Sequence, residues 1–447
     1  MKWYNKLLCC SVSAIACISR VSAQENDGLL KDSGWSYHFQ FTGILQGHPS
    51  FSAPYSGQNS LQPAREQAFS VTSTLYLGRK LWKGASAYFD PEMVAGKGVS
   101  TTLGVAGFPN GETFRIGDPA PSVYIARLFL RQYIDLDKNN YEEISEDVTQ
   151  VRERVSVSRL RLSLGKFGLA DFFDNNSVSH DPRSDFMNWA LMNNGAFDYA
   201  ANTRGYTYGF VAELIKPTFT LRLATALEPT FSNGPRLDWH YTRTNSENIE
   251  FEKRYSIHNR KGVLRLLGYY NINKAPNYMD AVSEKQNGTD TSLDAIYGKN
   301  YGSKKLGLGF NMEQELGNSI KSFLRIGWND GRTATWAFAE IDNTVSAGIR
   351  FAGKSWKRNA DNIGMAILSN GISSDHQNFL NAGGYGFMIG DGKLPNYTRE
   401  NIVEIFYELK IIPAVWGTLD YQFVGHPAYN ADRGPVHLFA ARVHIAW

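Results

Sequence analysis

Apolar and polar residues alternate along most of the chain with a period of two. From residue 35 the odd positions read Trp35, Tyr37, Phe39 and Phe41, and the positions between them are polar. Such segments recur as far as the last residue, Trp447, and each spans roughly 9 to 13 residues, the length of a tilted strand that crosses a bilayer. Period two is typical of β-strands whose two faces meet different surroundings. The pattern predicts an all-β chain of two-faced strands.

The polar face of many of these strands carries charge. In one segment Arg127 and Arg131 alternate with Tyr124, Ala126 and Leu128, so we expect the last three to share the apolar face. In lipid all backbone donors and acceptors must pair within the sheet, which requires a closed barrel. We therefore predict a transmembrane antiparallel outer-membrane β-barrel with apolar residues outside and charged residues in the lumen. Further inward charges are expected at Arg159, Arg161, Glu213, Arg222, Glu404, Glu408, Asp420 and Arg442.

Links between the predicted strands alternate between tight and long. Tight turns are expected at 83–84, 216–217, 317–318 and 413–414, and long links at 45–67, 95–121, 168–203 and 274–302. Short periplasmic turns and long external loops produce this asymmetry in outer-membrane barrels. The link from 135 to 154, which is rich in Asp and Glu, is an exception that we expect on the periplasmic side. The strand count comes to 16, and 18 is possible because residues 335–400 can be divided in more than one way.

The N-terminus has the pattern of a signal peptide. Lys2 and Lys6 precede an apolar run that is too short to span a bilayer as a helix, and small residues precede Gln24. Cleavage near Ala23 would leave a short periplasmic segment, residues 24–34, and a single barrel domain, residues 35–447. Cys17 allows a weaker alternative, a lipoprotein signal. The expected location is the bacterial outer membrane.

Composition excludes several function classes. All three cysteines, Cys9, Cys10 and Cys17, lie in the predicted signal peptide, so neither a disulfide framework nor thiol catalysis is expected. Removing that segment also leaves 43 basic and 43 acidic residues, a balance that does not favour nucleic-acid binding. The nine histidines show no metal-ligand spacing, and no nucleophile motif is recognisable. We therefore expect no enzyme activity, cofactor or metal.

An ordered set of short blocks resembles one family. The blocks are 78–85 with 88–92, 107–112, 165–167, 179–183, 186–189, 203–206 and 389–392. Together they are similar to the carbohydrate-selective porins of the OprB type, from about residue 35 to 447. The resemblance implies a 16-stranded barrel that lets mono- or oligosaccharides diffuse through a narrowed lumen of charged and aromatic residues. A non-selective general porin and a structural barrel remain as alternatives.

Two clusters are candidates for the narrow part of the lumen. The first is a ladder of opposed charges on neighbouring strands: Asp90, Glu92, Arg127, Arg131, Arg159 and Arg161. Arginine forks and carboxylates can exchange hydrogen bonds with sugar hydroxyls. Equally, such charges could simply neutralise one another and keep the lumen wet. Because arginines lead in this group, we expect a mild anion preference at low salt.

The second cluster lies in the long link 171–203, which contains His180, Asp181, Arg183 and Trp189. If this link folds into the lumen, Arg183 could bind a sugar and Trp189 could stack against its apolar face. The alternative is a loop that packs on itself and seals the barrel wall.

The outward face and the last strand point to further partners. Outward apolar residues are expected to contact outer-membrane lipid. The strand from Val436 to Trp447 ends on an aromatic residue, which resembles the signal read by the barrel-insertion machinery.

Overall fold

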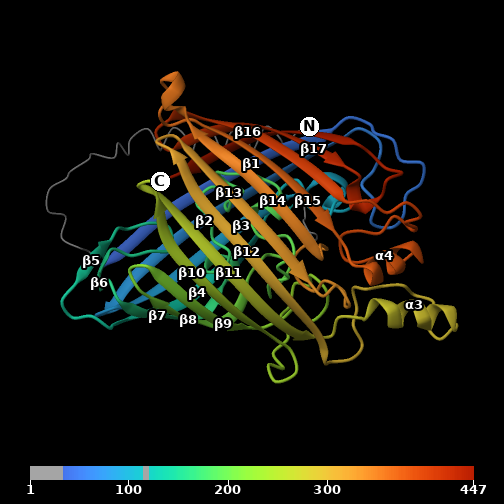
Figure 1. Ribbon diagram of the computed structural model, residues 1–447, viewed down its shortest axis with the longest axis horizontal. Coiled ribbons are helices and arrows are strands. Elements are labelled where there is room, and N and C mark those ends of the chain that lie inside the picture. Colours follow the sequence, from blue (N-terminus) through green and yellow to red (C-terminus); the bar gives the residue numbers. More distant parts are fainter. Residues whose placement is uncertain (1–33, 114–119) are drawn as a thin grey trace.

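The chain forms a closed antiparallel barrel of 16 strands (Figure 1). The computed structural model describes residues 34–113 and 120–447. Neighbouring strands in the sequence pair around the barrel, and β18 closes it against β1. One pairing skips two strands: β4 pairs with β7, and β5 and β6 form a separate two-stranded sheet. The predicted 16-stranded barrel is confirmed. The predicted signal peptide lies outside the described residues.

The barrel strands are β1 (Trp35–His48), β2 (Glu66–Trp82), β3 (Ala85–Gly96), β4 (Ser122–Asp135), β7 (Arg159–Phe167), β8 (Thr207–Ile215), β9 (Phe219–Ala226), β10 (Asn245–Ile257), β11 (Arg260–Asn273), β12 (Ser303–Gly317), β13 (Ile320–Asn329), β14 (Asn343–Ala352), β15 (Asn362–Gly371), β16 (Glu400–Ile412), β17 (Val415–Gly425) and β18 (Val436–Ala446). The small sheet contains β5 (Tyr141–Ile144) and β6 (Glu153–Ser156), and the helices are α2 (Trp189–Met192), α3 (Tyr278–Gln286) and α4 (Ser374–Asn381). Short 3-10 turns are η1 (Val99–Thr101), η2 (Leu169–Asp171), η3 (Gly353–Trp356) and η4 (Pro427–Tyr429).

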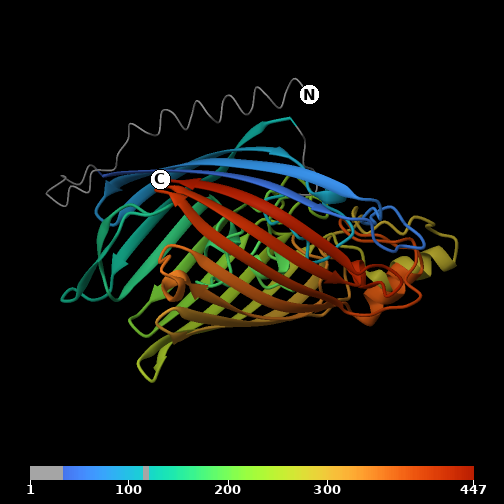
Figure 2. The ribbon, with the colours of Figure 1, turned by 90° about the horizontal axis from the view of Figure 1, so that it is seen from above.

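The two ends of the barrel differ in the length of their links. At the end that holds Trp35 and Trp447, which we call the turn end, β2–β3, β8–β9, β10–β11, β12–β13 and β16–β17 are joined by tight turns. The opposite loop end holds the long links, and α3 and α4 project from it (right in Figures 1 and 2). Residues 136–158, which we call the acidic link, lie at the turn end with β5 and β6. They thus lie at the same end of the barrel as the tight turns.

Outward side chains alternate with buried ones along the strands, as the period-two pattern predicts. The exposed large apolar residues include Leu130, Leu164, Leu223, Ile249, Leu308 and Ile367. Exposed aromatic residues lie near both rims, with Trp35, Trp82 and Trp447 at the turn end and Trp239 and Trp328 at the loop end. Aromatic residues at both edges of an apolar band are typical of outer-membrane barrels. Among the described residues, no helix is long and apolar enough to cross a membrane.

One strand departs from the predicted alternation. The register of β3 against β4 runs from Asp90 opposite Arg127 directly to Pro91 opposite Ile125, which leaves Ala126 as an extra residue. Proline has no amide hydrogen for the ladder and is tolerated at such a bulge. The bulge reverses the face of the preceding residues, so Ile125 points outward and the Tyr124 hydroxyl donates to Glu92 in the lumen. The expectation that Tyr124 and Ala126 share the outward face with Leu128 was therefore wrong.

Candidate permeation pathway

One cavity of about 430 Å³ lies in the lumen beside β1 to β4. Its wall is formed by inward residues of these strands, among them Gln40, Tyr76 and Glu92. Residues 168–206, which we call the lumen loop, face this wall across the cavity. At the turn end Asp147 of the acidic link reaches the cavity, and Asn233 of the link 227–244 lines it toward the loop end. The cavity therefore extends between segments that belong to opposite ends of the barrel.

The lumen loop is fastened to the far wall through its backbone. The Glu404 carboxylate on β16 accepts hydrogen bonds from the backbone N–H groups of Met187 (2.5 Å) and Asn188 (3.1 Å). Arg325 on β13 is fully buried and donates to the carbonyl oxygens of Leu191 and Ser179, each at 2.7 Å. An irregular segment inside a barrel must satisfy its backbone groups there, and strand side chains do so here. The link 171–203 thus folds into the lumen.

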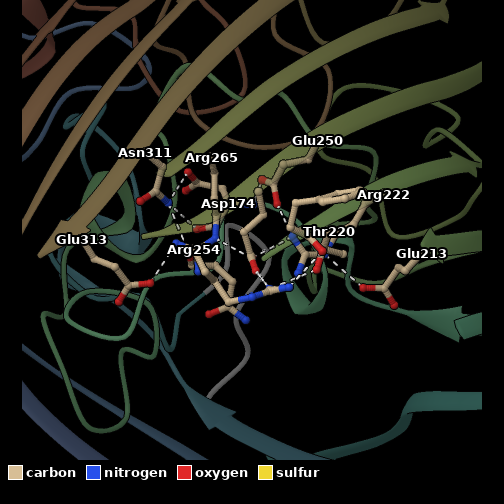
Figure 3. A network of polar contacts seen from close by, with 12 residues as sticks. Asp174, Glu213, Thr220, Arg222, Glu250, Arg254, Arg265, Asn311 and Glu313 are labelled. Carbon is tan, nitrogen blue, oxygen red and sulfur yellow. Dashed lines mark hydrogen bonds and ion pairs between the residues drawn. The ribbon is translucent and has the colours of Figure 1, made fainter. Parts of the chain in front are cut away.

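A ladder of alternating charges runs beneath the loop on β8 to β12 (Figure 3). Arg222 bridges Glu213 (Nε to Oε1, 3.0 Å) and Glu250 (Nη1 to Oε1, 2.7 Å). Arg265 continues the ladder to Glu313 (Nη1 to Oε1, 2.9 Å). The loop covers this ladder, because Glu250 and Glu313 also accept hydrogen bonds from the backbone N–H groups of residues 174 and 177. These inward charges hold the loop in place.

Arg183 fastens the lumen loop to the opposite wall. Its guanidinium donates to Glu92 at 2.9 Å and to Glu112 at 3.0 Å. It also donates to Gln40, Thr74 and Tyr76 at 3.2, 3.2 and 2.8 Å. Burial raises the pKa of Glu112, and the positive charge of Arg183 opposes this rise. Arg183 therefore has little donor capacity left for a passing solute, and it fixes the width of the cavity at this level.

Arg127 forms a second fixed pair at the cavity. Its Nε and Nη2 atoms donate to the two oxygens of Asp171 at 2.7 and 2.6 Å, and Asp90 lies 3.8 Å from Nη1. Burial would raise the pKa of Asp171, but the ion pair with Arg127 outweighs it and keeps the pKa below its usual value. The Arg127 guanidinium also lies 5.4 Å from the ring centroid of Tyr206. Two arginines and their carboxylates thus line one side of a narrow, polar passage.

Comparison with known proteins identifies this architecture. The model of the carbohydrate-selective porin, OprB family, matches residues 58–447. The chain belongs to this family. The structure of Pseudomonas putida OprB at high pH is similar with a TM-score of 0.71 and 14% identity, over 93% of this chain and 94% of that chain. The low-pH structure of the same protein gives 0.50 and 10%, over 93% of each chain, and Acinetobacter baumannii DcaP gives 0.48 and 8%, over 94% and 99%. No curated protein sequence matches significantly.

The family and the fold establish the general function. This protein is a carbohydrate-selective porin of the bacterial outer membrane, as the sequence blocks implied. Sugars are its implied solutes. Family and fold indicate a channel rather than an enzyme.

The porin brings together three of the six ladder residues expected from the sequence. Glu92 and Arg127 line the cavity, where Arg183 joins them, and the buried Asp90 lies beside Arg127. The other three have partners elsewhere. Arg161 pairs with Glu213, while Arg159 pairs with Glu142 at 2.7 Å and Arg131 donates to the carbonyl oxygen of Thr149 at 3.1 Å, both in the acidic link.

Trp189 lies in a packed core at the edge of the cavity. Its ring stacks on Phe338 with centroids 5.8 Å apart and an interplanar angle of 8°. Its Nε1 donates to the carbonyl oxygen of Asn110 at 2.9 Å, and the side chain is 5% exposed. The loop therefore enters the lumen and, through Trp189, packs on neighbouring loops. One face of the Trp189 ring is occupied by protein.

Several lining residues come from loops and were not among the predicted site residues. They are Glu112, Asp147, Asp171, Arg204 and Tyr206. The blocks 107–112 and 203–206 contained Glu112, Arg204 and Tyr206. The period-two pattern of strands, however, does not predict where the side chain of a loop residue points. Only the fold shows that these residues line the same cavity as Glu92 and Arg127.

Proposed function

We propose that sugars cross this porin through the cavity between the β1–β4 wall and the lumen loop. The observation that carries the proposal is the extent of that cavity, whose lining includes both the acidic link at the turn end and the link 227–244 at the loop end. A second cavity of about 340 Å³ lies under β11 to β15 at the turn end. Its lining comprises tight-turn and strand-end residues together with Ser177 of the lumen loop, and among the described residues it includes no other from the loop-end links, so it does not join the two ends of the barrel.

The chemistry of the passage suits a hydroxylated, neutral solute. Glu92, Arg127 and Arg183 form a fixed polar frame, with Asp90 beside Arg127, while partly exposed groups such as Gln40 and Asp181 can exchange hydrogen bonds with a solute. A permeant must replace water hydrogen bonds without being trapped, which weak and numerous contacts allow. Trp189 borders the cavity, but its nearly buried ring does not offer an open face on which a sugar could stack. Arg131, Arg159 and Arg161 support the wall and the acidic link.

The outer surface supports two further parts of the proposal. The exposed apolar band and its aromatic rims would contact outer-membrane lipid. The last strand closes the barrel against β1, and the ring of Trp447 lies 5.7 Å from that of Phe39. We propose that this strand is read by the insertion machinery, so removal of Trp447 should lower the amount of folded barrel in outer membranes.

Proteoliposome swelling tests the permeation route. The purified porin should pass a monosaccharide faster than a polyethylene glycol of equal hydrodynamic radius, and the rate should fall steeply with sugar length. Equal rates for sugar and polymer would indicate a general porin, and no swelling with any solute would indicate a structural barrel. Arg183→Gln should raise the size limit and reduce the preference for sugar, because it releases the loop from Glu92 and Glu112. Arg358→Gln, a half-exposed arginine at the turn end, serves as the matched control.

A further inference from the structure

The described lining of the pathway carries more negative than positive formal charge. Its carboxylates are Glu92, Glu112, Asp147, Asp171 and Asp181, and its arginines are Arg127, Arg183 and Arg204. Residues 114–119, which the structure does not describe, contain one arginine and one aspartate and so add no net formal charge. The strands alone led us to expect an excess of arginine. The additional carboxylates come mainly from loops.

Two of these carboxylates lack a positively charged partner. Glu92 and Glu112 share Arg183, and Asp171 pairs with Arg127. Within the described part of the chain, no ion pair within 4.0 Å involves Asp147 or Asp181. Asp181 accepts a hydrogen bond from the backbone N–H of Arg183 at 2.9 Å, and Asp147 accepts one from the backbone N–H of Val148 at 2.7 Å. Each carboxylate is thus hydrogen-bonded to a backbone N–H group, but no cationic side chain of the described residues lies within ion-pair distance of it.

The two unpaired carboxylates belong to different segments. Asp181 lies in the middle of the lumen loop, beside the fixed Arg183 frame, and is partly exposed. Asp147 is exposed near the tip of the acidic link, at the turn end. A solute that crosses the barrel passes both groups in succession. In a narrow channel with low-dielectric walls, the field of such charges is focused along the path and acts on every charged solute.

We infer that this porin selects its carbohydrates by charge: neutral and cationic sugars pass, anionic sugars such as uronates and sugar phosphates are rejected, and Asp147 and Asp181 are the determining residues. The inference rests on the proposed pathway. Screening limits its range, because the Debye length is about 10 Å at 0.1 M ionic strength. At low salt we expect glucosamine and glucose to permeate at least about threefold faster than glucuronate, and potassium to permeate faster than chloride.

The test combines reversal potentials in a potassium chloride gradient with swelling rates for glucose, glucosamine and glucuronate. The Asp147→Asn, Asp181→Asn double variant should lose most of the discrimination against glucuronate, measured as the ratio of its glucuronate rate to its own glucose rate. Glu143→Gln serves as the control, because it removes a negative charge from an exposed position of the acidic link that does not line the cavity.

The outcomes separate this inference from the pathway itself. Equal rates for glucose and glucuronate in the unmodified porin, or a chloride preference, would overturn the charge selection while leaving the pathway intact. Discrimination that survives in the double variant, or is lost in Glu143→Gln, would overturn the assignment to Asp147 and Asp181. Absence of glucose permeation would overturn the pathway.

Discussion

The lumen loop and the acidic link both enter the barrel, but they are held there by different forces. The lumen loop is anchored by buried charges that bind its backbone, and Phe186 and Trp189 pack in an apolar core. The acidic link is held by few buried groups and by partly exposed ion pairs, such as Arg159 with Glu142. The comparison shows that the lumen loop is an integral part of the barrel interior. The acidic link, in contrast, can be altered without loss of the barrel.

The largest expected effect is on the anchor of the lumen loop. Arg325→Met removes the partner of Asp174, whose Oδ2 lies 2.9 Å from Arg325 Nε, and frees the carbonyl oxygens of Leu191 and Ser179. Removal of one member of a buried ion pair costs about 3 to 5 kcal/mol. We expect higher single-channel conductance and protease cleavage within the loop, with β-sheet content unchanged in circular dichroism. Unchanged conductance would show that the loop is held mainly by its apolar core.

A smaller effect is expected where the acidic link touches the wall. A Cβ atom at Gly78 on β2 would lie 2.8 Å from Cγ1 of Val151, which is buried. Gly78→Val should displace the tip of the link at a cost of about 1 to 3 kcal/mol and raise conductance moderately. At Gly43 the nearest such contact is 3.6 Å, so Gly43→Val is the matched control. Equal conductance of the two variants would contradict this contact.

Trp189 should matter for packing more than for permeation. Trp189→Phe keeps an aromatic ring against Phe338 but removes the hydrogen bond to the Asn110 carbonyl, whose net contribution is about 1 kcal/mol. We expect a slightly lower thermal midpoint and a glucose swelling rate within about twofold of the unmodified porin. A large loss of sugar flux, with normal folding, would restore a direct stacking role.

The smallest effect is expected for the ion pair between Arg159 and Glu142. The Glu142 side chain is 51% exposed, so solvent screens the pair and its contribution is at most about 1 kcal/mol. Arg159 is buried but keeps its hydrogen bond to the carbonyl oxygen of Ser156 when Glu142 is changed. Glu142→Gln should therefore leave conductance and heat stability almost unchanged. A marked rise in conductance would mean that the acidic link is held by its charges rather than by Val151 and its neighbours.

The barrel could be predicted from the sequence because the two faces of each strand are visible in consecutive residues. Alternation and inward charges such as Glu404 and Arg442 are visible in neighbouring residues, and they account for the strand count and the lumen face. The bulge at Ala126 was missed because one extra residue shifts the faces without changing the composition, although Pro91 was a visible signal for it.

The site was less predictable, because its contacts join distant segments. Arg183 binds β1, β2 and β3, whose residues lie far from it in sequence, and no local spacing encodes such contacts. The formal charge of the described cavity lining was hidden from the sequence for the same reason. A count of the inward charged residues on the predicted strands near the cavity gives more arginines than carboxylates. The carboxylates of Glu112, Asp147, Asp171 and Asp181 reach the cavity from loops, which that count leaves out.

Cysteine accessibility tests most directly whether the pathway follows the β1–β4 wall. Residues 18–447 contain no cysteine, so a single thiol can be placed at will. Gln40→Cys lies at the cavity, and Ser346→Cys is an inward, buried position on β14 beyond the lumen loop. A charged methanethiosulfonate reagent should reduce the current of Gln40→Cys, more slowly when glucose is present, and leave Ser346→Cys unaffected. Block at Ser346→Cys with none at Gln40→Cys would contradict the account.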